Sequence, residues 1–213
     1  MRKYLLSLVA VVPFLTACSE PTSHAHGVYM LVDTSGTYTQ EIDKAARIIN
    51  FTLAKLQPGD AFAVASINTG SFSEKNIVAK VNFETIPSQA NQQKRKFRQT
   101  VMDWTNDVNS APYTDISGGV LQAIEFLNEK ELGRKTILIF SDMKEELKEG
   151  YVRDIPLQLQ GFEIVALNVT KLRTDNIDPR EYLDRLEAWE GRVRSGGGEW
   201  RVINDLERLE KLI

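Results

Sequence analysis

The sequence predicts a single α/β domain, in which a doubly wound, mostly parallel central sheet carries helices on both faces. Segments typical of strands alternate with segments typical of helices along most of the chain. The main strand segments are continuous apolar runs, as expected of parallel strands that are buried on both faces. No repeat of about 20–50 residues and no low-complexity tract interrupts the alternation. We therefore expect one domain rather than an array of units.

The first half of the folded part is expected to contain three strands and one helix. Val28–Val32 is a continuous apolar run, which predicts a buried parallel strand. Residues 42–56 carry apolar side chains at helical spacing, and Pro58-Gly59 ends that helix. Ala61–Ile67 is a second apolar run and predicts a second buried strand. Ile77–Phe83 alternates between apolar and polar residues, so we expect an edge strand there.

The second half continues the alternation. Residues 88–104 predict a polar, basic helix, and residues 117–131 predict a helix with apolar side chains on one face. Thr136–Phe140 and Phe162–Val169 are apolar runs that predict the third and fourth buried strands. The last elements expected are a helix at Pro179–Arg194, a strand at Trp200–Ile203 and a helix at Asp205–Ile213.

The composition agrees with an ordinary globular domain. The chain has 213 residues, of which 42% are hydrophobic and 26% are charged, and this balance argues against both disorder and a polytopic membrane protein. The formal net charge of −3 gives no electrostatic reason to expect a nucleic acid as partner. The single cysteine excludes a disulfide framework and a zinc site built from cysteines.

The N-terminus has the features of a bacterial lipoprotein signal. Arg2 and Lys3 precede a short apolar run at Tyr4–Phe14, and the segment ends in L-T-A-C at Cys18. A basic start, a short apolar stretch and small residues before a cleavage site are typical of a secretory signal. The ending resembles the lipobox, whose cleavage makes the cysteine the acylated first residue of the mature protein. Ser19 rather than Asp follows, which resembles the outer-membrane default of Gram-negative lipoproteins.

This interpretation divides the chain into three parts. We expect a lipoprotein signal peptide at 1–17, an acylated cysteine and a tether at 18–27, and the folded domain at 28–213. The tether holds both histidines, His24 and His26. Two ligands on a flexible segment make a weak metal site, so we expect a spacer there. The protein is expected to be anchored at a membrane, namely the outer membrane facing the periplasm if the source is Gram-negative.

Polar residues follow two of the predicted strands, and a third polar group precedes the helix at 117–131. The strand at Val28–Val32 is followed by D-T-S-G-T at 33–37, and the strand at Thr136–Phe140 is followed by S-D at 141–142. Y-T-D at 113–115 stands before the helix. In doubly wound sheets, ligands bind beyond the carboxyl ends of the strands. We therefore expect these groups to meet at one edge of the sheet and to form the functional site.

These side chains suit a hard divalent cation. Magnesium prefers six oxygen ligands and keeps several waters. Hydroxyls can bind it as neutral ligands, while carboxylates hold coordinated waters from a second layer. Few directly bound carboxylates leave the ion with uncompensated charge and an open position, which an Asp or Glu of a partner can fill. The expected metal site comprises Asp33, Ser35, Thr37, Thr114 and Asp142.

The same residues resemble the metal-ion-dependent adhesion site of the von Willebrand factor type A (VWA) domain family. The family's D-x-S-x-S signature is similar to D-T-S-G-T at 33–37, with Thr37 in place of the last Ser. The family's separate Thr looks like Thr114, and its late Asp looks like Asp142. The resemblance covers roughly residues 27–213. It implies a Rossmann-like sheet, one Mg²⁺ or Mn²⁺ ion, and cation-dependent binding of a protein that supplies an Asp or Glu carboxylate.

Two departures from the family pattern lie at the site. Thr37 keeps the hydroxyl but adds a methyl group that crowds the metal. Met143 follows the late Asp, where many family members have Gly. The turn after the strand at Thr136–Phe140 is therefore expected to differ from the family's usual geometry.

Two other functions stay open. A domain that keeps this sheet without tight metal binding would be a metal-independent periplasmic interaction or scaffold module. A haloacid-dehalogenase-type phosphatase would use Asp33 as its nucleophile, but Ser35 stands where its general acid belongs. The nearest candidates for its late acidic pair are Asp175 and Asp178. Ser-His-Asp catalysis would need a histidine from the tether. We therefore expect a binding protein and not an enzyme.

Two charge clusters have ordinary explanations. A basic run on the helix at 88–104 is expected to form a solvated face. An acidic run after the third strand is expected either to begin a solvated helix or to add to a cation-attracting field. The basic run comprises Lys94, Arg95, Lys96 and Arg98, and the acidic run comprises Glu145, Glu146 and Glu149.

Overall fold

The computed structural model describes residues 23–36, 38–68, 70, 72–169, 178–205 and 212–213. Within these residues, six strands form one sheet in the order β3-β2-β1-β4-β5-β6. Neighbouring strands are parallel, except that β2 and β3 are antiparallel. The predicted doubly wound, mostly parallel sheet is therefore confirmed, and so is the predicted edge strand, whose antiparallel direction the sequence did not indicate. The strands are β1 (His26–Asp33), β2 (Ala61–Ile67), β3 (Ile77–Asn82), β4 (Arg134–Phe140), β5 (Phe162–Leu167) and β6 (Glu199–Ile203).

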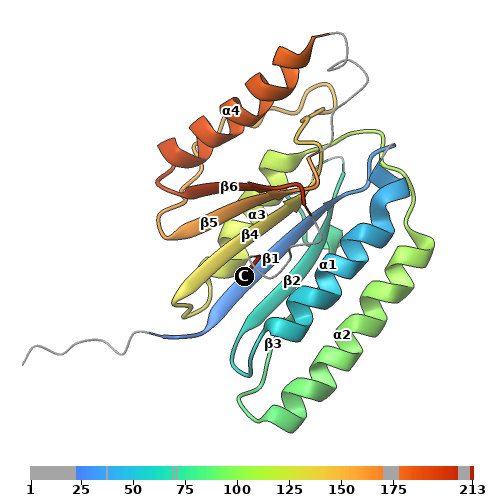
Figure 1. Cartoon of the computed structure of the whole chain (residues 1–213), viewed down its shortest axis with the longest axis vertical. Coiled ribbons are helices and arrows are strands. Elements are labelled where there is room, and N and C mark those ends of the chain that lie inside the picture. The colour runs from blue at the N-terminus through green and yellow to red at the C-terminus, as the bar shows by residue number, and fades with distance from the viewer. Residues whose placement is uncertain (1–22, 37, 69, 71, 170–177, 206–211) are drawn as a thin grey trace, which may run out of the picture.

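Helices cover both faces of the sheet (Figure 1). Helices α1 (Ile42–Lys55) and α2 (Pro87–Asp107) pack on one face. Helices α3 (Ile116–Asn128) and α4 (Pro179–Ser195) pack on the other. The short 3-10 helices η1 (Tyr38–Glu41) and η2 (Glu74–Asn76) lie in the loops after β1 and β2.

Strand β1 lies at the centre of the sheet and is buried on both sides. Val28, Met30 and Val32 join the cluster of apolar side chains under α1 and α2. Tyr29 and Leu31 join the cluster under α3, and all five side chains are fully buried. Full burial of such a side chain is worth roughly 1.5–3 kcal/mol. The strand is therefore a rigid support for the polar residues that follow it.

The N-terminal boundary of the domain differs from the prediction. Strand β1 begins at His26, two residues before the predicted start, so the placement of His26 in the tether is wrong. Its backbone amide donates to Oδ1 of Asp60 at 2.8 Å, and its ring Nε2 lies 2.9 Å from the hydroxyl of Thr136. Burial lowers the pKa of His26 to about 4. His24 is exposed, as a residue of a spacer would be.

Other boundaries shift by a few residues. Helix α2 continues to Asp107, and β4 begins at Arg134 rather than Thr136. Residues 205–213, predicted as a helix, fall mostly outside the described residues, and so do the predicted signal peptide and Cys18. Among the helices that the structure describes, none combines the length and the hydropathy needed to cross a bilayer.

Candidate metal centre

The carboxyl ends of β1 and β4 bring the first two candidate residues together. The two strands are parallel neighbours, with Val32 opposite Phe140 in the register. The next residues, Asp33 on β1 and Ser141 after β4, are both polar and therefore lie side by side. The hydroxyl of Ser141 donates to Oδ2 of Asp33 at 2.7 Å. The sheet register thus fixes this contact between residues more than one hundred positions apart in the chain.

Asp33 is an almost fully buried acid, with 1% of its surface exposed. Its second carboxylate oxygen, Oδ1, accepts a hydrogen bond from the backbone amide of Ser35 at 2.8 Å. Burial raises the pKa of Asp33, although the hydrogen bonds from Ser35 and Ser141 act in the opposite direction. The hydroxyl of Thr34 donates to the carbonyl of Ile67 at the end of β2 and ties the loop to the neighbouring strand.

Asp142 is a second buried acid at the same edge. Its side chain is 6% exposed, and its Oδ1 accepts a hydrogen bond from the amide of Lys144 at 2.8 Å. Burial raises the pKa of Asp142 to about 6, and the negative charge of Asp33 adds to the increase. Arg185 of α4 donates to the backbone carbonyl of Asp142 at 2.9 Å, and its charge partly offsets the effect.

Met143 adopts the backbone conformation that a glycine would provide. Its φ is +66°, in the left-handed region that L side chains rarely occupy. The side chain is buried in the cluster under α3 and α4, and its carbonyl accepts a hydrogen bond from Trp189 Nε1 at 2.9 Å. Its amide donates to Oγ of Ser141 at 3.0 Å. The turn therefore adopts a left-handed geometry although it lacks glycine, because packing and hydrogen bonds hold the strained residue.

The loop between α2 and α3 carries the remaining described candidate, Thr114, to this edge. The amide of Ala111 donates to the carbonyl of Thr34 at 2.8 Å, and Ala111 pairs with Ser35 in an isolated bridge. Thr114 pairs with Glu146, and both backbone hydrogen bonds of that bridge are made, at 2.8 and 2.9 Å. The loop is thus fastened on one side to the segment after β1 and on the other to the segment after β4.

Four of the five predicted ligands therefore lie at the carboxyl edge of β1 and β4, namely Asp33, Ser35, Thr114 and Asp142. Thr37 lies outside the described residues. Within the described part of the chain, no three His, Cys, Asp or Glu side chains gather as a metal cage. A site built from two carboxylates and several hydroxyls is not expected to form such a cage.

The donor set fits a hard divalent cation. Two carboxylates that are buried close to one another are costly to ionise without a nearby positive charge. The raised pKa of Asp142 expresses that cost. Ser35 and Thr114 add neutral oxygen donors, the ligands that magnesium tolerates well. A cation at this edge would remove the penalty on both acids, so the residues present suit the ion.

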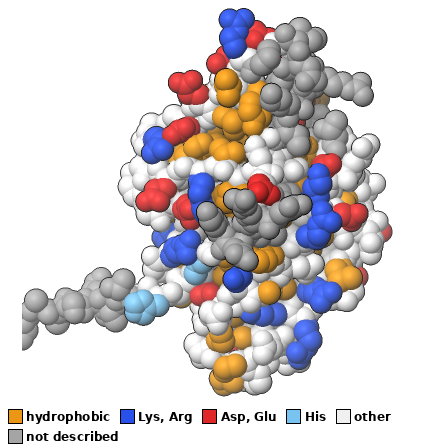
Figure 2. All heavy atoms as spheres, in the orientation of Figure 1, with side chains coloured by type: hydrophobic (Ala, Val, Ile, Leu, Met, Phe, Trp, Pro, Cys, Tyr) orange, Lys and Arg blue, Asp and Glu red, His pale blue; other side chains and the backbone are white. Residues whose placement is uncertain are grey.

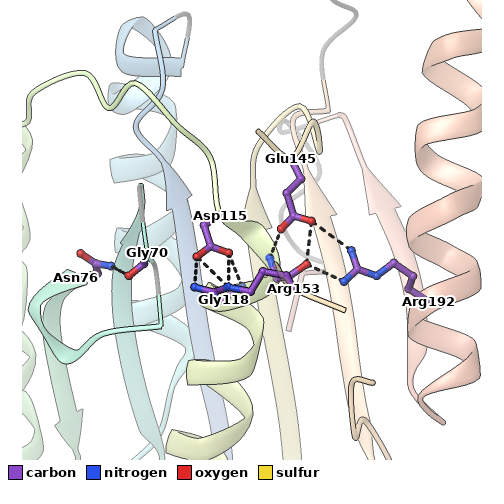
Figure 3. A network of polar contacts seen from close by, with 8 residues as sticks. Gly70, Asn76, Asp115, Gly118, Glu145, Arg153 and Arg192 are labelled. Atoms are coloured by element: carbon purple, nitrogen blue, oxygen red, sulfur yellow. Dashed lines mark hydrogen bonds and ion pairs between the residues drawn. The ribbon is translucent and has the colours of Figure 1, made fainter. Parts of the chain in front are cut away.

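The sequence prediction missed the polar residues that fix the start of α3. Asp115 is the N-cap of α3, and its Oδ1 accepts a hydrogen bond from the amide of Gly118 at 2.8 Å. The guanidinium of Arg153 forms an ion pair with the same carboxylate at 2.7 Å (Figure 3). Gly118 leaves the room for this arrangement, because a Cβ there would lie 2.5 Å from Asp115 Oδ2. The D-x-x-G spacing could have indicated the cap, but nothing in the sequence points to Arg153.

Glu145 belongs to the same support. Its carboxylate accepts hydrogen bonds from the amide and the hydroxyl of Ser117, at 2.6 and 2.9 Å, and Arg192 of α4 bonds to that hydroxyl at 2.7 Å (Figure 3). No helix begins at the acidic run, so that predicted role is wrong, whereas the negative charge of Glu146 helps to raise the pKa of Asp33, as the predicted cation-attracting field requires. Glu145 itself has a structural contact. It is occupied at the N-terminus of α3. This network holds the neighbouring Thr114 in place.

The basic run of α2 is solvated, with one exception. Lys and Arg side chains spread over the face of α1 and α2 (Figure 2). Arg95, Lys96 and Arg98 are exposed, as predicted. Lys94 instead bends over the Phe83 ring, 5.6 Å from its centroid, and donates to the carbonyl of Leu56 at the end of α1.

The geometry gives little support to the phosphatase alternative. Asp178 caps α4, where it accepts from the amide of Arg180 at 3.0 Å and pairs with its guanidinium at 2.9 Å. Asp175, the other candidate, lies outside the described residues.

No protein-family model and no curated protein sequence matches the chain. Solved structures do match. A von Willebrand factor type A protein from Catenulispora acidiphila superposes with a TM-score of 0.57 at 15% identity, over 88% of this chain and 40% of that one. The pilus adhesin SpaC from Lactobacillus rhamnosus GG superposes with a TM-score of 0.54 at 10% identity, over 89% of this chain and 29% of that one. The PilB minor pilin from Streptococcus sanguinis superposes with a TM-score of 0.51 at 10% identity, over 89% of this chain and 60% of that one. This chain thus spans less than two thirds of each of these proteins.

Proposed function

Because the chain has the fold of a VWA domain, we propose that it is a membrane-anchored lipoprotein that binds a partner protein through one divalent cation. The observation that supports this function is the buried pair of acids at the carboxyl edge of the sheet, Asp33 and Asp142, in a loop framework that also presents hydroxyls. Burial raises the pKa of both acids, so the site is poised to accept a positive charge.

Each residue has a part in this proposal. The hydroxyls of Ser35, Thr37 and Thr114 would bind a Mg²⁺ or Mn²⁺ ion directly, and Asp33 and Asp142 would hold its coordinated waters. The ion supplies a concentrated positive charge and an open position, which an Asp or Glu of the partner fills. The product of the site is a complex between two proteins, without chemical turnover. Two of the similar structures are a pilus adhesin and a minor pilin, which is in keeping with a binding role.

The anchor completes the proposal. Cleavage after residue 17 would leave Cys18 as the acylated first residue, and the segment up to the start of β1 would tether the domain. Several acyl chains on one cysteine suffice for firm attachment to a bilayer. In a Gram-negative source, the domain would face the periplasm from the outer membrane.

Cation-dependent capture of partners tests this function. The mature chain, with Cys18→Ser so that it stays in solution, is coupled to a resin and exposed to detergent-solubilised envelope proteins in Mg²⁺ or in EDTA. We expect a partner that is retained in Mg²⁺, released by EDTA, and lost with Thr114→Val, which removes one hydroxyl at nearly constant volume. Asp184→Asn, at an exposed position on α4, serves as the matched control. A partner that survives both EDTA and Thr114→Val would establish the metal-independent interaction module instead.

A further inference from the structure

A polar pocket of about 580 Å³ lies beside the candidate metal centre and has no part in the proposed metal binding. It lies between the carboxyl ends of β1 and β2, the last turn of α2 and the loop that leads to α3. The residues that matter for its chemistry are Thr34, Asn68, Trp104, Asp107, Asn109 and Ala111.

The pocket and the metal centre share a wall. Thr34 lines the pocket and stands between Asp33 and Ser35 in the chain. Ala111 also lines it, and pairs with Ser35. An extended peptide advances about 3.3–3.6 Å per residue. A partner whose carboxylate reaches the cation therefore has its neighbouring side chains within reach of this pocket.

The last turn of α2 gives the pocket a negative potential. The C-terminal carbonyls of a helix carry partial negative charge, which basic residues in the last turn usually offset. Helix α2 has no basic residue in its last turn and places Asp107 there instead. Its four basic residues stand in the middle of the helix, between Lys94 and Arg98. The charge pattern of α2 thus runs against its own dipole at the end that borders the pocket.

Trp104 adds an aromatic surface to this negative potential. Its ring is half-buried, packs against the apolar cluster under α2, and lines the pocket. Tryptophan is the best aromatic partner for a cation, and such contacts are worth roughly 0.5–2 kcal/mol. The side-chain amides of Asn68 and Asn109 supply further oxygen acceptors. Among the described residues that line the pocket there is no Lys, Arg or His.

We propose that this pocket binds a Lys or Arg side chain of the partner, placed next in sequence to the Asp or Glu that completes the cation shell. The carboxylate of Asp107 and the Trp104 ring hold the cationic head, and the amides of Asn68 and Asn109 accept its hydrogen bonds. This inference rests on the proposed function, since it assigns a second contact to the same partner. The recognised segment therefore carries an acidic and a basic residue in close succession.

Short peptides test the pocket directly. The probes are N-acetyl-Arg-Asp-amide and N-acetyl-Asp-Arg-amide, each paired with a version in which citrulline, a neutral analogue of similar shape, replaces Arg. Binding to the ¹⁵N-labelled mature chain carrying Cys18→Ser is followed by NMR in Mg²⁺ and in EDTA. We expect at least one Arg peptide to bind about five-fold more tightly than its citrulline version and to shift the indole N–H signal of Trp104.

Two variants separate the pocket from general charge. Asp107→Asn is expected to abolish the preference for Arg over citrulline while the citrulline peptide binds as before. Asp103→Asn removes the same charge from the exposed face of the same helix and should leave the preference intact. Equal binding of Arg and citrulline peptides, or equal losses in the two variants, would overturn the inference.

A third probe, N-acetyl-Arg-amide, distinguishes failure of the pocket from failure of the metal centre. If the acidic peptides show no Mg²⁺-dependent binding but this probe still shifts Trp104 in the wild type and not in Asp107→Asn, the proposed function is wrong and the pocket stands. If no Arg-containing probe shifts Trp104, the pocket inference is wrong, whatever the metal centre does.

Discussion

Replacing Asp142 by Asn should stabilise the metal-free protein, although the residue belongs to the proposed site. Burial raises the pKa of Asp142 from its ordinary value of 3.8 to about 6 in the folded protein. At 1.36 kcal/mol per pKa unit, this shift lowers the stability of the folded protein at pH 7.5 by about 3 kcal/mol relative to a carboxylate with the ordinary pKa. Asn keeps the acceptor for the Lys144 amide and cannot ionise. We expect a gain of roughly 1–3 kcal/mol at pH 7.5, because relaxation and water entry reduce the full value.

The direction of the pH dependence follows from the raised pKa. The folded protein binds the proton of Asp142 more tightly than the unfolded chain does, so the penalty is absent below about pH 4. It develops as the pH rises through 6. Asp142→Asn should therefore match the wild type near pH 4 and exceed it at pH 7.5.

Urea unfolding in EDTA at both pH values measures this difference. Asp184→Asn, at an exposed position on α4, is the matched control and should leave stability within about 0.5 kcal/mol. Saturating Mg²⁺ should stabilise the wild type and leave Asp142→Asn unchanged. A variant that is less stable than the wild type at pH 7.5 in EDTA, or equally shifted at both pH values, would refute the reasoning.

Three further predictions concern the supports of the site, and urea unfolding checks each of them. Gly118→Ala should cost about 2 kcal/mol, since its Cβ would lie 2.5 Å from the Asp115 carboxylate; an unchanged midpoint would contradict the described cap. Met143→Gly should be less destabilising than Met143→Ala by about 1 kcal/mol, because both lose the buried side chain and only Gly relieves the positive φ; the reverse order would show that φ is not strained. Because the pKa of His26 is lowered, its contribution to folding stability is complete above about pH 6.5 and is lost as the pH falls toward 4. Over that range the wild type should lose about 1–2 kcal/mol more stability than His26→Gln does. Parallel stability profiles of the two proteins against pH would disprove this.

The sheet could be predicted because its signals are local. The apolar runs of the buried strands and the turn at Pro58-Gly59 report on their own segments, and parallel order follows from the helices between them. His26 could not be placed in this way. Its strand position depends on Asp60 and Thr136, which are distant in sequence, and a polar residue in a polar segment gives no apolar signal.

The candidate site likewise has residues that the sequence could indicate and contacts that it could not. Asp33 and Asp142 could be proposed because polar residues at the carboxyl ends of parallel strands meet at one edge. Thr114, in the loop before α3, could be proposed from the resemblance to the VWA signature, and its bridge to Glu146 brings it to the same edge. The ion pair of Arg153 with Asp115 could not be predicted, since it joins a surface loop to a helix N-terminus across the fold. The left-handed turn was also unexpected, because Met143 gives no sign in the sequence that tertiary packing will hold it at positive φ.

Calorimetric titration of Mg²⁺ into the mature chain with Cys18→Ser tests the central claim most directly. The account predicts saturable binding of one ion, at least ten-fold weaker with Thr114→Val and unchanged with Asp184→Asn. Binding should also weaken below pH 6 as Asp142 takes up its proton. The absence of Mg²⁺ and Mn²⁺ binding in the wild type, or equal affinity in wild type and Thr114→Val, would contradict a metal centre at this edge of the sheet.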